Sequence, residues 1–406
     1  MTDEAPRISW TEAEASRSAR WRSERGSPAP RRVVPADDRM TADAAYRLAC
    51  EGTALLWRGD YHNARQLLTA LARRLDRTAE QSAKKKAAGA KEQASATRGS
   101  PAMAQRFHQH RQVQAQRARV LSMLLLELDG GYRLDLRRAP DVAEACAQAW
   151  GPADGQAQVV SLRELQALIG AYEWRRRGVE IPALAQPPGA YARIHPHYGV
   201  FSPVRGEYVD LVAQALSKHM PAALRQQPLA FDIGTGTGVL AAVLARRGVR
   251  EVVATDMDAR ALACAQENLR RLGVAAQVRL QPADLFPEGR AALLLCNPPW
   301  VPARASAPVE RAVYDEDSAM LRGFLAGATA HLLPGGEAWL VLSDLAEHLG
   351  LRSREALLDW IAAAGLTVLG RHDIRPRHGK AADASDALHA ARAAEVTSLW
   401  RLGAAA

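Results

Sequence analysis

The 406-residue chain has few cysteines and no long apolar run, and each shortage excludes a class of protein. Its four cysteines are scattered, without a CxxC pair or a histidine cluster at metal-ligand spacing, so we expect neither structural disulfides nor a metal site. The longest uncharged apolar runs, such as residues 239–245, fall far short of the roughly 20 residues that span a bilayer. The first ten residues contain no basic stretch followed by an apolar core, which argues against a secretory signal. These absences predict a cytoplasmic protein with no membrane segment.

Positive charge is concentrated in two stretches of the chain. Of the net charge of +9, a net of +8 lies in segment 81–119, where nine lysines and arginines face the single acid Glu92. A second basic cluster occupies residues 371–380. Such segments can bind a phosphate backbone, but a charge run is also typical of a solvated linker, and both interpretations stay open. Together the two segments favour ribosomal or transfer RNA as a partner over a protein, and the sequence gives no indication of the oligomeric state.

Composition divides the chain into four parts. Residues 1–40 are rich in Arg, Ser, Pro and Glu and predict a disordered tail. Residues 41–180 carry leucines and alanines at helical spacing and predict a mostly helical N-terminal domain, interrupted by a basic flexible loop at 79–101. Residues 181–197 contain a Pro-Pro-Gly turn and predict a linker. In residues 198–406 strands alternate with helices, which predicts an α/β sheet with helices on both faces. The main expected strands of this last part are Leu229–Ile233, Glu251–Thr255, Gln277–Gln281, Ala292–Cys296, Glu337–Ser343, Leu366–Gly370 and Glu395–Leu402.

A glycine-rich loop follows the first of these strands. Asp232 and Ile233 precede Gly234, Thr235, Gly236, Thr237 and Gly238, at the point where the strand turns into a helix. Three glycines at alternate positions let the backbone approach a ligand and expose N–H groups at the amino end of the helix. A dinucleotide-binding loop requires G-x-G-x-x-G/A, and Val239 stands where its third small residue belongs, so a dehydrogenase is disfavoured. By itself the loop also fits a simple glycine-rich turn.

Two acids follow the next two expected strands. Asp256 ends the second strand, 18 residues after Gly238, where a carboxylate can accept both ribose hydroxyls of a nucleoside cofactor. Asp284 follows the third strand, where it could accept an adenine amino group while Leu285 and Phe286 flank the ring. The alternative for each acid is a helix cap or a solvated loop position.

The most specific motif is Asn297-Pro298-Pro299-Trp300, directly after a buried apolar run. Two prolines fix the backbone where it leaves a central strand, an unusual arrangement unless something is held there. The Asn297 side-chain oxygen and the Pro298 carbonyl can accept both hydrogens of a planar NH2 group, and Trp300 can stack on a flat substrate. The alternative is a proline turn with a packing tryptophan. The acids at 315–317 are explained equally well by the amino end of a helix.

The glycine loop, Asp256, Asp284 and the Asn-Pro-Pro-Trp motif occur together in an order that resembles the class I S-adenosylmethionine-dependent methyltransferases. The likeness is to members with an (Asn/Asp/Ser)-Pro-Pro-aromatic motif. Residues 198–205 and the helical segment after them are similar to the lead-in of the release-factor glutamine and ribosomal RNA guanine-N2 methyltransferases. The resemblance covers about residues 198–402. It departs from the glutamine enzymes at Trp300, where they usually have tyrosine, and the N-terminal domain resembles no release-factor-binding domain.

The resemblance implies a Rossmann-like, seven-stranded methyltransferase sheet, S-adenosylmethionine as the cofactor and no metal. It implies methylation of a planar amino or amide nitrogen, and the basic segments favour an exocyclic amine of an RNA base. A protein glutamine, a small-molecule amine and a non-catalytic cofactor- or RNA-binding assembly factor stay open as alternatives. The implied catalytic residues are Asn297, Pro298, Pro299 and Trp300. The implied cofactor-binding residues are Asp232, Gly234, Thr235, Gly236, Thr237, Gly238, Asp256, Asp284, Leu285 and Asn297.

Overall fold

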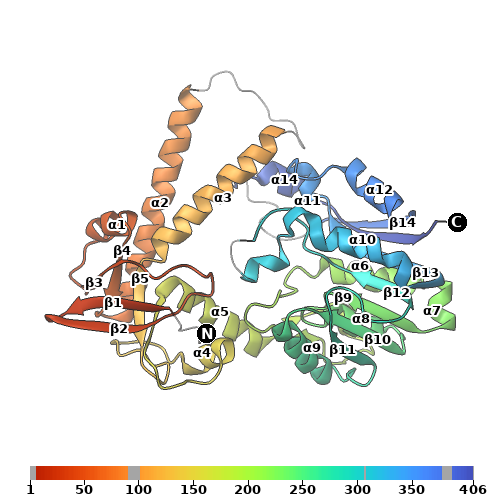
Figure 1. The fold of residues 1–406 in the computed structure, drawn as a ribbon, viewed down its shortest axis with the longest axis horizontal. Helices are drawn as coiled ribbons and strands as arrows, with labels where there is room; N and C mark the ends of the chain where they lie inside the picture. Colours follow the sequence, from red (N-terminus) through yellow and green to blue (C-terminus); the bar gives the residue numbers. More distant parts are fainter. Residues whose placement is uncertain (1–5, 90–100, 306–307, 377–385, 406) are drawn as a thin grey trace. The chain divides into compact units, whose positions relative to one another are not determined.

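The computed structural model describes residues 6–89, 101–305, 308–376 and 386–405 (Figure 1). It contains two compact units. The N-terminal unit comprises residues 1–95 and 108–173, and the C-terminal unit comprises residues 96–107 and 174–406. Within the described ranges, no helix combines the length and the apolar character that a bilayer span requires.

The N-terminal unit contains a mixed six-stranded sheet of order β1-β2-β6-β5-β4-β3. β3, β4 and β5 are parallel, β6 is antiparallel to β5, and the hairpin β1–β2 joins through a parallel pairing of β2 with β6. The strands are β1 (Arg7–Glu12), β2 (Ala15–Trp21), β3 (Arg32–Ala36), β4 (Thr53–Trp57), β5 (Leu124–Leu128) and β6 (Gln158–Ser161). The helices are α1 (Ala42–Cys50), α2 (Tyr61–Gly89), α4 (Ala143–Trp150), and most of α3 (Pro101–Leu121) and α5 (Leu162–Arg177).

Strand β4 is buried on both faces and shows how this sheet is packed. Leu55 and Trp57 belong to the apolar cluster that contains α2 and α5 side chains. Ala54 and Leu56 belong to the cluster on the opposite face, which contains Ile8 of β1. Successive side chains of a strand point to opposite faces, so one short apolar strand contributes to both cores.

The first 40 residues do not form the expected disordered tail. Residues 7–36 include three strands, and Ile8 and Trp10 of β1 are only 1% and 5% exposed. The alternation of buried Ile8 and Trp10 with exposed polar residues lets the hairpin cover one face of the sheet, although its average composition is polar. Helices account for most of residues 41–180, as expected, but β4, β5 and β6 lie among them.

The expected flexible loop at 79–101 is only partly open to comparison. Residues 79–89 continue helix α2 instead of forming a loop. Lys, Ala and Gln are strong helix formers, so a basic, alanine-rich sequence can extend a helix as readily as it can form a linker. Residues 90–100 lie outside the described residues.

The C-terminal unit contains the seven-stranded sheet that the sequence predicts, in the order β11-β10-β9-β12-β13-β15-β14. The first five strands of this order are parallel, and β15 runs antiparallel to both β13 and β14. The strands are β9 (Leu229–Ile233), β10 (Glu251–Asp256), β11 (Val278–Pro282), β12 (Ala291–Cys296), β13 (Leu332–Ser343), β14 (Leu366–Ile374) and β15 (Thr397–Ala404).

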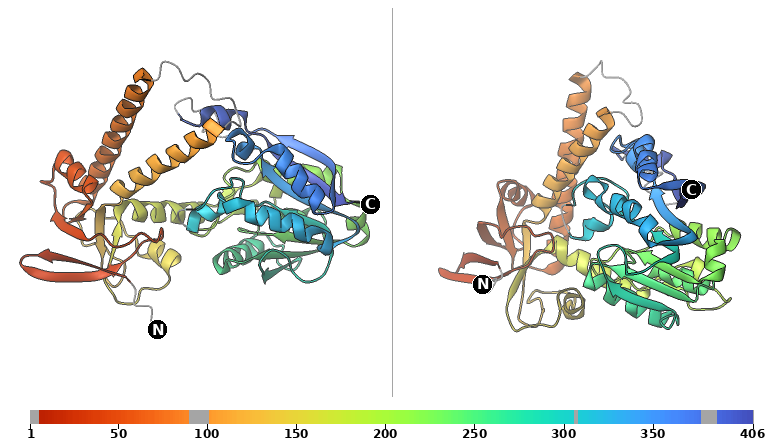
Figure 2. Two further views of the ribbon diagram at one scale, coloured as in Figure 1. Left: turned by 45° about the horizontal axis from the view of Figure 1, so that its top comes forward. Right: turned by 45° about the vertical axis from the view of Figure 1, so that its right-hand side comes forward.

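Helices pack on both faces of this sheet, green to blue in Figure 2. α6, α8 and α9 pack with one face, and α10 and α12 with the other. The helices are α6 (Glu207–Lys218), α7 (Ala222–Gln226), α8 (Val239–Arg246), α9 (Ala259–Arg271), α10 (Ala319–His331), α11 (Leu345–His348), α12 (Arg354–Ala363) and α14 (His389–Ala394), with short 3-10 turns η1 (Pro182–Leu184), η2 (Pro308–Ala312) and η3 (Glu316–Ser318).

Residues 181–197, expected to form a linker, belong to the core of the C-terminal unit. The two-residue strands β7 (Val179–Glu180) and β8 (Arg193–Ile194) pair with each other around this segment. Ile181, Leu184 and Ile194 are buried in the cluster that contains α6 and α8. Apolar residues on either side of the Pro-Pro-Gly turn therefore attach this segment to the sheet's helices.

Candidate functional site

The sheet topology places the glycine loop beside the Asn-Pro-Pro-Trp motif. From β9 the chain runs outward through β10 and β11, then returns to β12 on the other side of β9. In this parallel sheet Ile233 pairs with Cys296 and also with Thr255. Gly234, Asp256 and Asn297 follow these three residues, so they leave neighbouring strands at the same edge. Ligands of open α/β sheets bind at such a reversal of strand order.

The glycine loop has the backbone conformation for which glycine is suited. Gly234, Gly236 and Gly238 have φ angles of 71°, 54° and 79°. A β-carbon at Gly234 would lie 2.5 Å from Met320 Cε, whereas one at Gly236 would meet no atom within 4 Å. The loop is therefore closed by Met320 at its start and open at Gly236, where its backbone can face a ligand. Met320 shows no pattern in the sequence that would single it out.

Asp232 is buried behind the glycine loop and does not face the open side of the loop. It is 1% exposed, and its Oδ2 accepts hydrogen bonds from Thr235 Oγ1 (2.6 Å) and Ala241 N (3.1 Å). Burial raises the pKa of Asp232 to about 6. Thr235 and Thr237 are also buried, and the Thr237 carbonyl accepts a hydrogen bond from Asn268 Nδ2 (3.1 Å). These three residues hold the loop in place.

Asp256 connects the end of β10 to the open glycine. Its Oδ2 accepts a hydrogen bond from Gly236 N (3.0 Å), and its Oδ1 accepts one from Asp258 N (2.9 Å). A carboxylate oxygen can accept two hydrogens, so each oxygen retains acceptor capacity for a hydroxyl group. Burial raises the pKa of Asp256 above its ordinary value. Asp258 caps helix α9 through Arg260 N (2.8 Å), as its position suggests.

The segment after β11 contains the three residues expected near the adenine, Asp284, Leu285 and Phe286. Asp284 is exposed, consistent with either a ligand-binding or a solvated acid. Leu285 has a left-handed backbone (φ 69°), and its carbonyl accepts a hydrogen bond from the buried Thr255 Oγ1 (2.5 Å). Phe286 stacks on Phe324 of α10, with ring centroids 5.8 Å apart. Phe286 therefore packs against α10, and Leu285 is held by its backbone.

The Asn-Pro-Pro-Trp motif contains an internal hydrogen bond. Trp300 Nε1 donates to Asn297 Oδ1 at 2.9 Å. Trp300 also packs against the apolar clusters on both faces of the sheet, so its ring is fixed. An amide oxygen has two lone pairs, and the indole occupies one of them. The bond thus selects one orientation of the Asn297 amide and leaves its oxygen able to accept one more hydrogen.

Asp315 caps helix α10. It is 8% exposed, and its carboxylate accepts hydrogen bonds from Met320 N (3.0 Å) and Leu321 N (3.2 Å). Burial raises the pKa of Asp315. The structure therefore favours the helix-end interpretation of the acids at 315–317, and through Met320 this cap also positions the side chain that closes the glycine loop.

The described part of the basic cluster at 371–380 stabilises the sheet. Arg371 lies within β14, where its Nη2 is 2.8 Å from Asp373 Oδ2 and its guanidinium is 5.2 Å from the centre of the Trp400 ring. His372 stacks on His219 at a centroid distance of 5.0 Å. Residues 377–380 lie outside the described residues. Across the described ranges, no group of three or more His, Cys, Asp or Glu side chains is arranged to hold a metal ion.

Comparison with known proteins agrees with this geometry. Residues 191–354 match the family model of the methyltransferase small domain. A release factor glutamine methyltransferase from Cereibacter sphaeroides is 35% identical over 178 residues, covering 40% of this chain and 58% of the relative. The ribosomal RNA small subunit methyltransferase C of Alcanivorax borkumensis is 34% identical over 146 residues, covering 35% and 40% of the two chains. A ribosomal protein L11 methyltransferase from Symbiobacterium thermophilum is 46% identical over 67 residues, covering 16% and 22%.

The chain thus spans no more than 58% of the length of any of these three relatives. The residues that match the family model, 191–354, include the glycine loop, the acid that ends β10 and the motif after β12. Residues 191–354 are thus similar in sequence to the methyltransferase small domain, and the strand order and loop geometry agree with that match.

Proposed function

We propose that this chain transfers a methyl group from S-adenosylmethionine to a planar nitrogen, and that the nitrogen is an exocyclic amine of an RNA base. The observation that carries the proposal is the pairing of Ile233 with Cys296. It makes the glycine loop and Asn297 leave adjacent parallel strands, which lie about 4.8 Å apart. A cofactor on the loop and a nitrogen at Asn297 would therefore be neighbours.

The residues present fit S-adenosylmethionine. The open backbone at Gly236 can approach the methionine part, and the two oxygens of Asp256 can each accept a ribose hydroxyl. Asp284 and the backbone of Leu285 are the remaining candidates for the adenine. Asp232, Thr235 and Thr237 act in this proposal by holding the loop, because their side chains are buried.

The motif would act by orienting the substrate nitrogen. When bound, S-adenosylmethionine supplies a methyl group on a positively charged sulfur, which is already electrophilic. Asn297 Oδ1 and the Pro298 carbonyl would accept the two amine hydrogens and direct the nitrogen lone pair toward that methyl group. Pro299 fixes the backbone of the motif, and Trp300 both orients Asn297 and offers a ring face to a flat substrate. The nitrogen becomes acidic as it gains the methyl group, so its proton can pass through these acceptors to water.

The charge of the N-terminal unit supports RNA as the substrate. Helix α2 alone carries seven lysines and arginines against two acids. The relatives are named for ribosomal RNA, a release factor and a ribosomal protein, so a protein glutamine is the competing substrate. An RNA or protein of the translation machinery would place this chain in the cytoplasm.

A labelling experiment tests the proposal. Purified protein and tritium-labelled S-adenosylmethionine are added to a lysate from cells that lack the protein, and the product is treated with ribonuclease or protease. We expect ribonuclease to release the label. Release by protease instead would support the glutamine alternative and contradict the RNA substrate. Absence of label in both fractions would contradict methyl transfer to either and favour a small-molecule amine or a non-catalytic assembly factor.

Asn297→Ala separates binding from transfer. We expect the turnover rate to fall by roughly 100- to 1000-fold, by analogy with the removal of one polar group that stabilises a transition state. We expect the affinity for S-adenosylmethionine, measured by calorimetry, to change by less than about twofold, since the glycine loop and Asp256 are untouched. Unchanged turnover would contradict the role of Asn297, and loss of cofactor binding as well would point to a misfolded variant or a misassigned cofactor site.

A further inference from the structure

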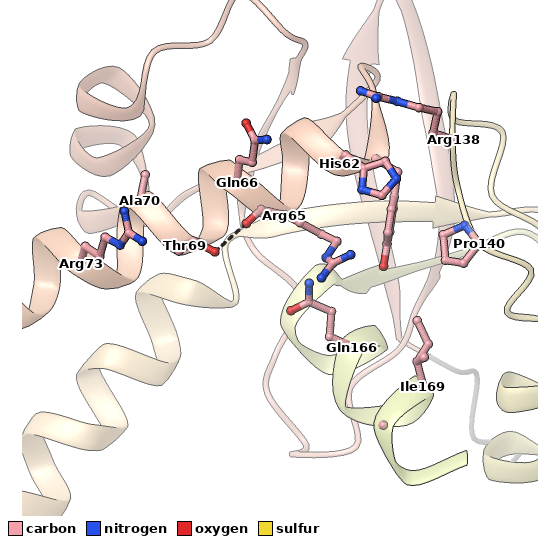
Figure 3. Close-up of a pocket in the computed structure, with 12 residues that line it drawn as sticks. His62, Arg65, Gln66, Thr69, Ala70, Arg73, Arg138, Pro140, Gln166 and Ile169 are labelled. Carbon is pink, nitrogen blue, oxygen red and sulfur yellow. Dashed lines mark hydrogen bonds between the residues drawn. The ribbon is translucent and has the colours of Figure 1, made fainter. Parts of the chain in front are cut away.

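The N-terminal unit contains a large cavity, broadly open to solvent, that lies mainly between two helices of that unit (Figure 3). Its volume is about 1090 Å³, and it is lined by one side of the first turns of α2, by part of α5, and by Arg138 and Pro140. The lining residues of α2 recur every three or four positions from His62 to Arg73, so they form a single stripe along the helix. The buried leucines of α2 and α5 meet in one apolar cluster, which keeps the two walls in place.

The cavity is positively charged. Arg65, Arg73 and Arg138 line it, and the lining contains no acid. Arg138 is partly compensated, because Arg138 and Arg137 share the buried Asp60 at 2.7 and 2.9 Å and hold its pKa well below the usual range. Arg65 and Arg73 are exposed, and neither forms an ion pair with any residue that the structure describes. Two uncompensated guanidinium groups therefore remain on the α2 wall.

The spacing of these arginines fits an extended polyanion. They are eight residues apart on α2, which is about 12 Å at 1.5 Å per residue. That separation exceeds the width of one phosphate group, so a single small anion would not reach both. Between them the α2 wall presents Gln66 and Thr69, and the α5 wall presents Gln166, all of which can hydrogen-bond to sugar hydroxyls or base edges (Figure 3).

The neighbouring charges at this part of α2 are paired. Arg74 pairs with Asp43 at 2.7 Å, and Asp76 pairs with Arg117 at 2.9 Å. The start of the helix is capped by Asp60, whose Oδ1 accepts a hydrogen bond from His62 N at 2.8 Å. Carboxylates and phosphates both form bidentate pairs with planar guanidinium groups, so the choice of a phosphodiester backbone follows from the RNA substrate of the proposed function.

We propose that this cavity binds the phosphate backbone of single-stranded RNA through Arg65 and Arg73. The N-terminal unit would thereby contribute to the affinity for the substrate. The proposal rests on the proposed function only in naming RNA as the substrate, because binding requires neither cofactor nor turnover.

The test measures binding of the full-length protein to a fluorescein-labelled 20-nucleotide single-stranded RNA of mixed sequence between 50 and 200 mM salt. The variant Arg65→Gln/Arg73→Gln is compared with a control, Arg31→Gln/Arg47→Gln, which removes the same charge from exposed positions outside the cavity. Each phosphate contact on a single strand contributes about 0.7 to the slope of log affinity against log salt. We expect the slope of the cavity variant to be smaller than that of the wild type by about 1.4. Between 50 and 200 mM salt, the affinity of the wild type should therefore fall by a factor about seven times larger than that of the variant. The control should keep the wild-type slope.

Equal slopes for the two double variants would overturn the proposal. Binding of poly-glutamate that depends on Arg65 and Arg73, without a matching effect on RNA, would show that the cavity serves an acidic protein and would also overturn it. Asn297→Ala separates RNA binding by the cavity from methyl transfer. If that variant binds the RNA normally but transfers no methyl group, both proposals stand, whereas a cavity variant with normal RNA binding and reduced labelling would leave only the proposed function.

Discussion

Replacing Trp300 by phenylalanine would isolate the hydrogen bond within the Asn-Pro-Pro-Trp motif. The indole of Trp300 donates to Asn297 Oδ1 at 2.9 Å and packs against the apolar clusters on both faces of the sheet. Phenylalanine keeps an aromatic face and most of the packing but removes the N–H donor. Without that donor the Asn297 amide can turn over and present its NH2 group, a second donor, to the substrate amine.

The structure sets the expected size of the effect. A hydrogen bond of this kind contributes about 1 kcal/mol net, which corresponds to roughly a fivefold change in rate when the interaction is required in the transition state. We therefore expect kcat for methyl transfer to fall about fivefold in Trp300→Phe, with KM changing less than about twofold because the stacking face remains. The loss should be much smaller than that in Asn297→Ala, which removes the acceptor itself.

The assay is steady-state methyl transfer with the labelled cofactor and the substrate fraction identified by the nuclease experiment. Trp360→Phe is the matched control, since Trp360 lies on α12, where its ring packs beneath Arg322 at 5.4 Å. Thermal unfolding should show both variants folded. A wild-type kcat in Trp300→Phe would refute the orienting role of the indole, and a rise in KM with unchanged kcat would show that Trp300 acts only in stacking.

Two further variants test the ends of β10 and α9. Asp256→Asn keeps the side chain's size but turns an amide NH2 toward either Gly236 N or Asp258 N. We therefore expect binding of S-adenosylmethionine to weaken by about 1.5–3 kcal/mol, or roughly 10- to 150-fold. A change in affinity below about twofold, measured by calorimetry, would contradict the ribose assignment. Burial alone would raise the pKa of Glu267, but hydrogen bonds from His197, Arg271 and Arg175 outweigh it and lower that pKa to about 2. Because the pKa of Glu267 is lower in the folded than in the unfolded state, its ionised carboxylate stabilises the fold above about pH 4.5, and this stabilisation is lost as the pH falls toward 2. Glu267→Gln should therefore lower the free energy of unfolding by roughly 2 kcal/mol at pH 7 and by progressively less below pH 4.5. Urea unfolding at several pH values measures this, and a pH-independent difference would contradict it.

The core strands of the C-terminal unit could be predicted because buried parallel strands are continuous apolar runs. The expected strand Leu229–Ile233 coincides with β9, and Ala292–Cys296 differs from β12 by one residue. The hairpin of β1 and β2 was not predictable from average composition, which is polar and rich in arginine. Its signal is the period-two placement of Ile8 and Trp10, which a window average conceals.

In the candidate site too, some features could be predicted from the sequence and others could not. Glycines, acids and prolines at strand ends can be found in a sequence because backbone geometry requires them there. The direction of a side chain depends on neighbours that are distant in the chain. Asp232 lies beneath its loop because Thr235 and Ala241 donate hydrogen bonds to it, and Phe286 stacks on Phe324 of α10. Met320 closes the loop from α10, nearly 90 residues after Gly234, and no local pattern marks it.

The order of strands in the larger sheet has a consequence for biosynthesis. β15, residues 397–404, lies between β13 and β14, so it is an interior strand formed by a segment that is synthesised after both of its neighbours. Until residue 404 has left the ribosome, β13 and β14 each present an unpaired edge, and unpaired edges favour aggregation. The nascent chain therefore passes through a period in which its sheet is incomplete. A ribosome that stalls before residue 397 would release a protein that depends on chaperones rather than a slightly shortened form of the folded protein.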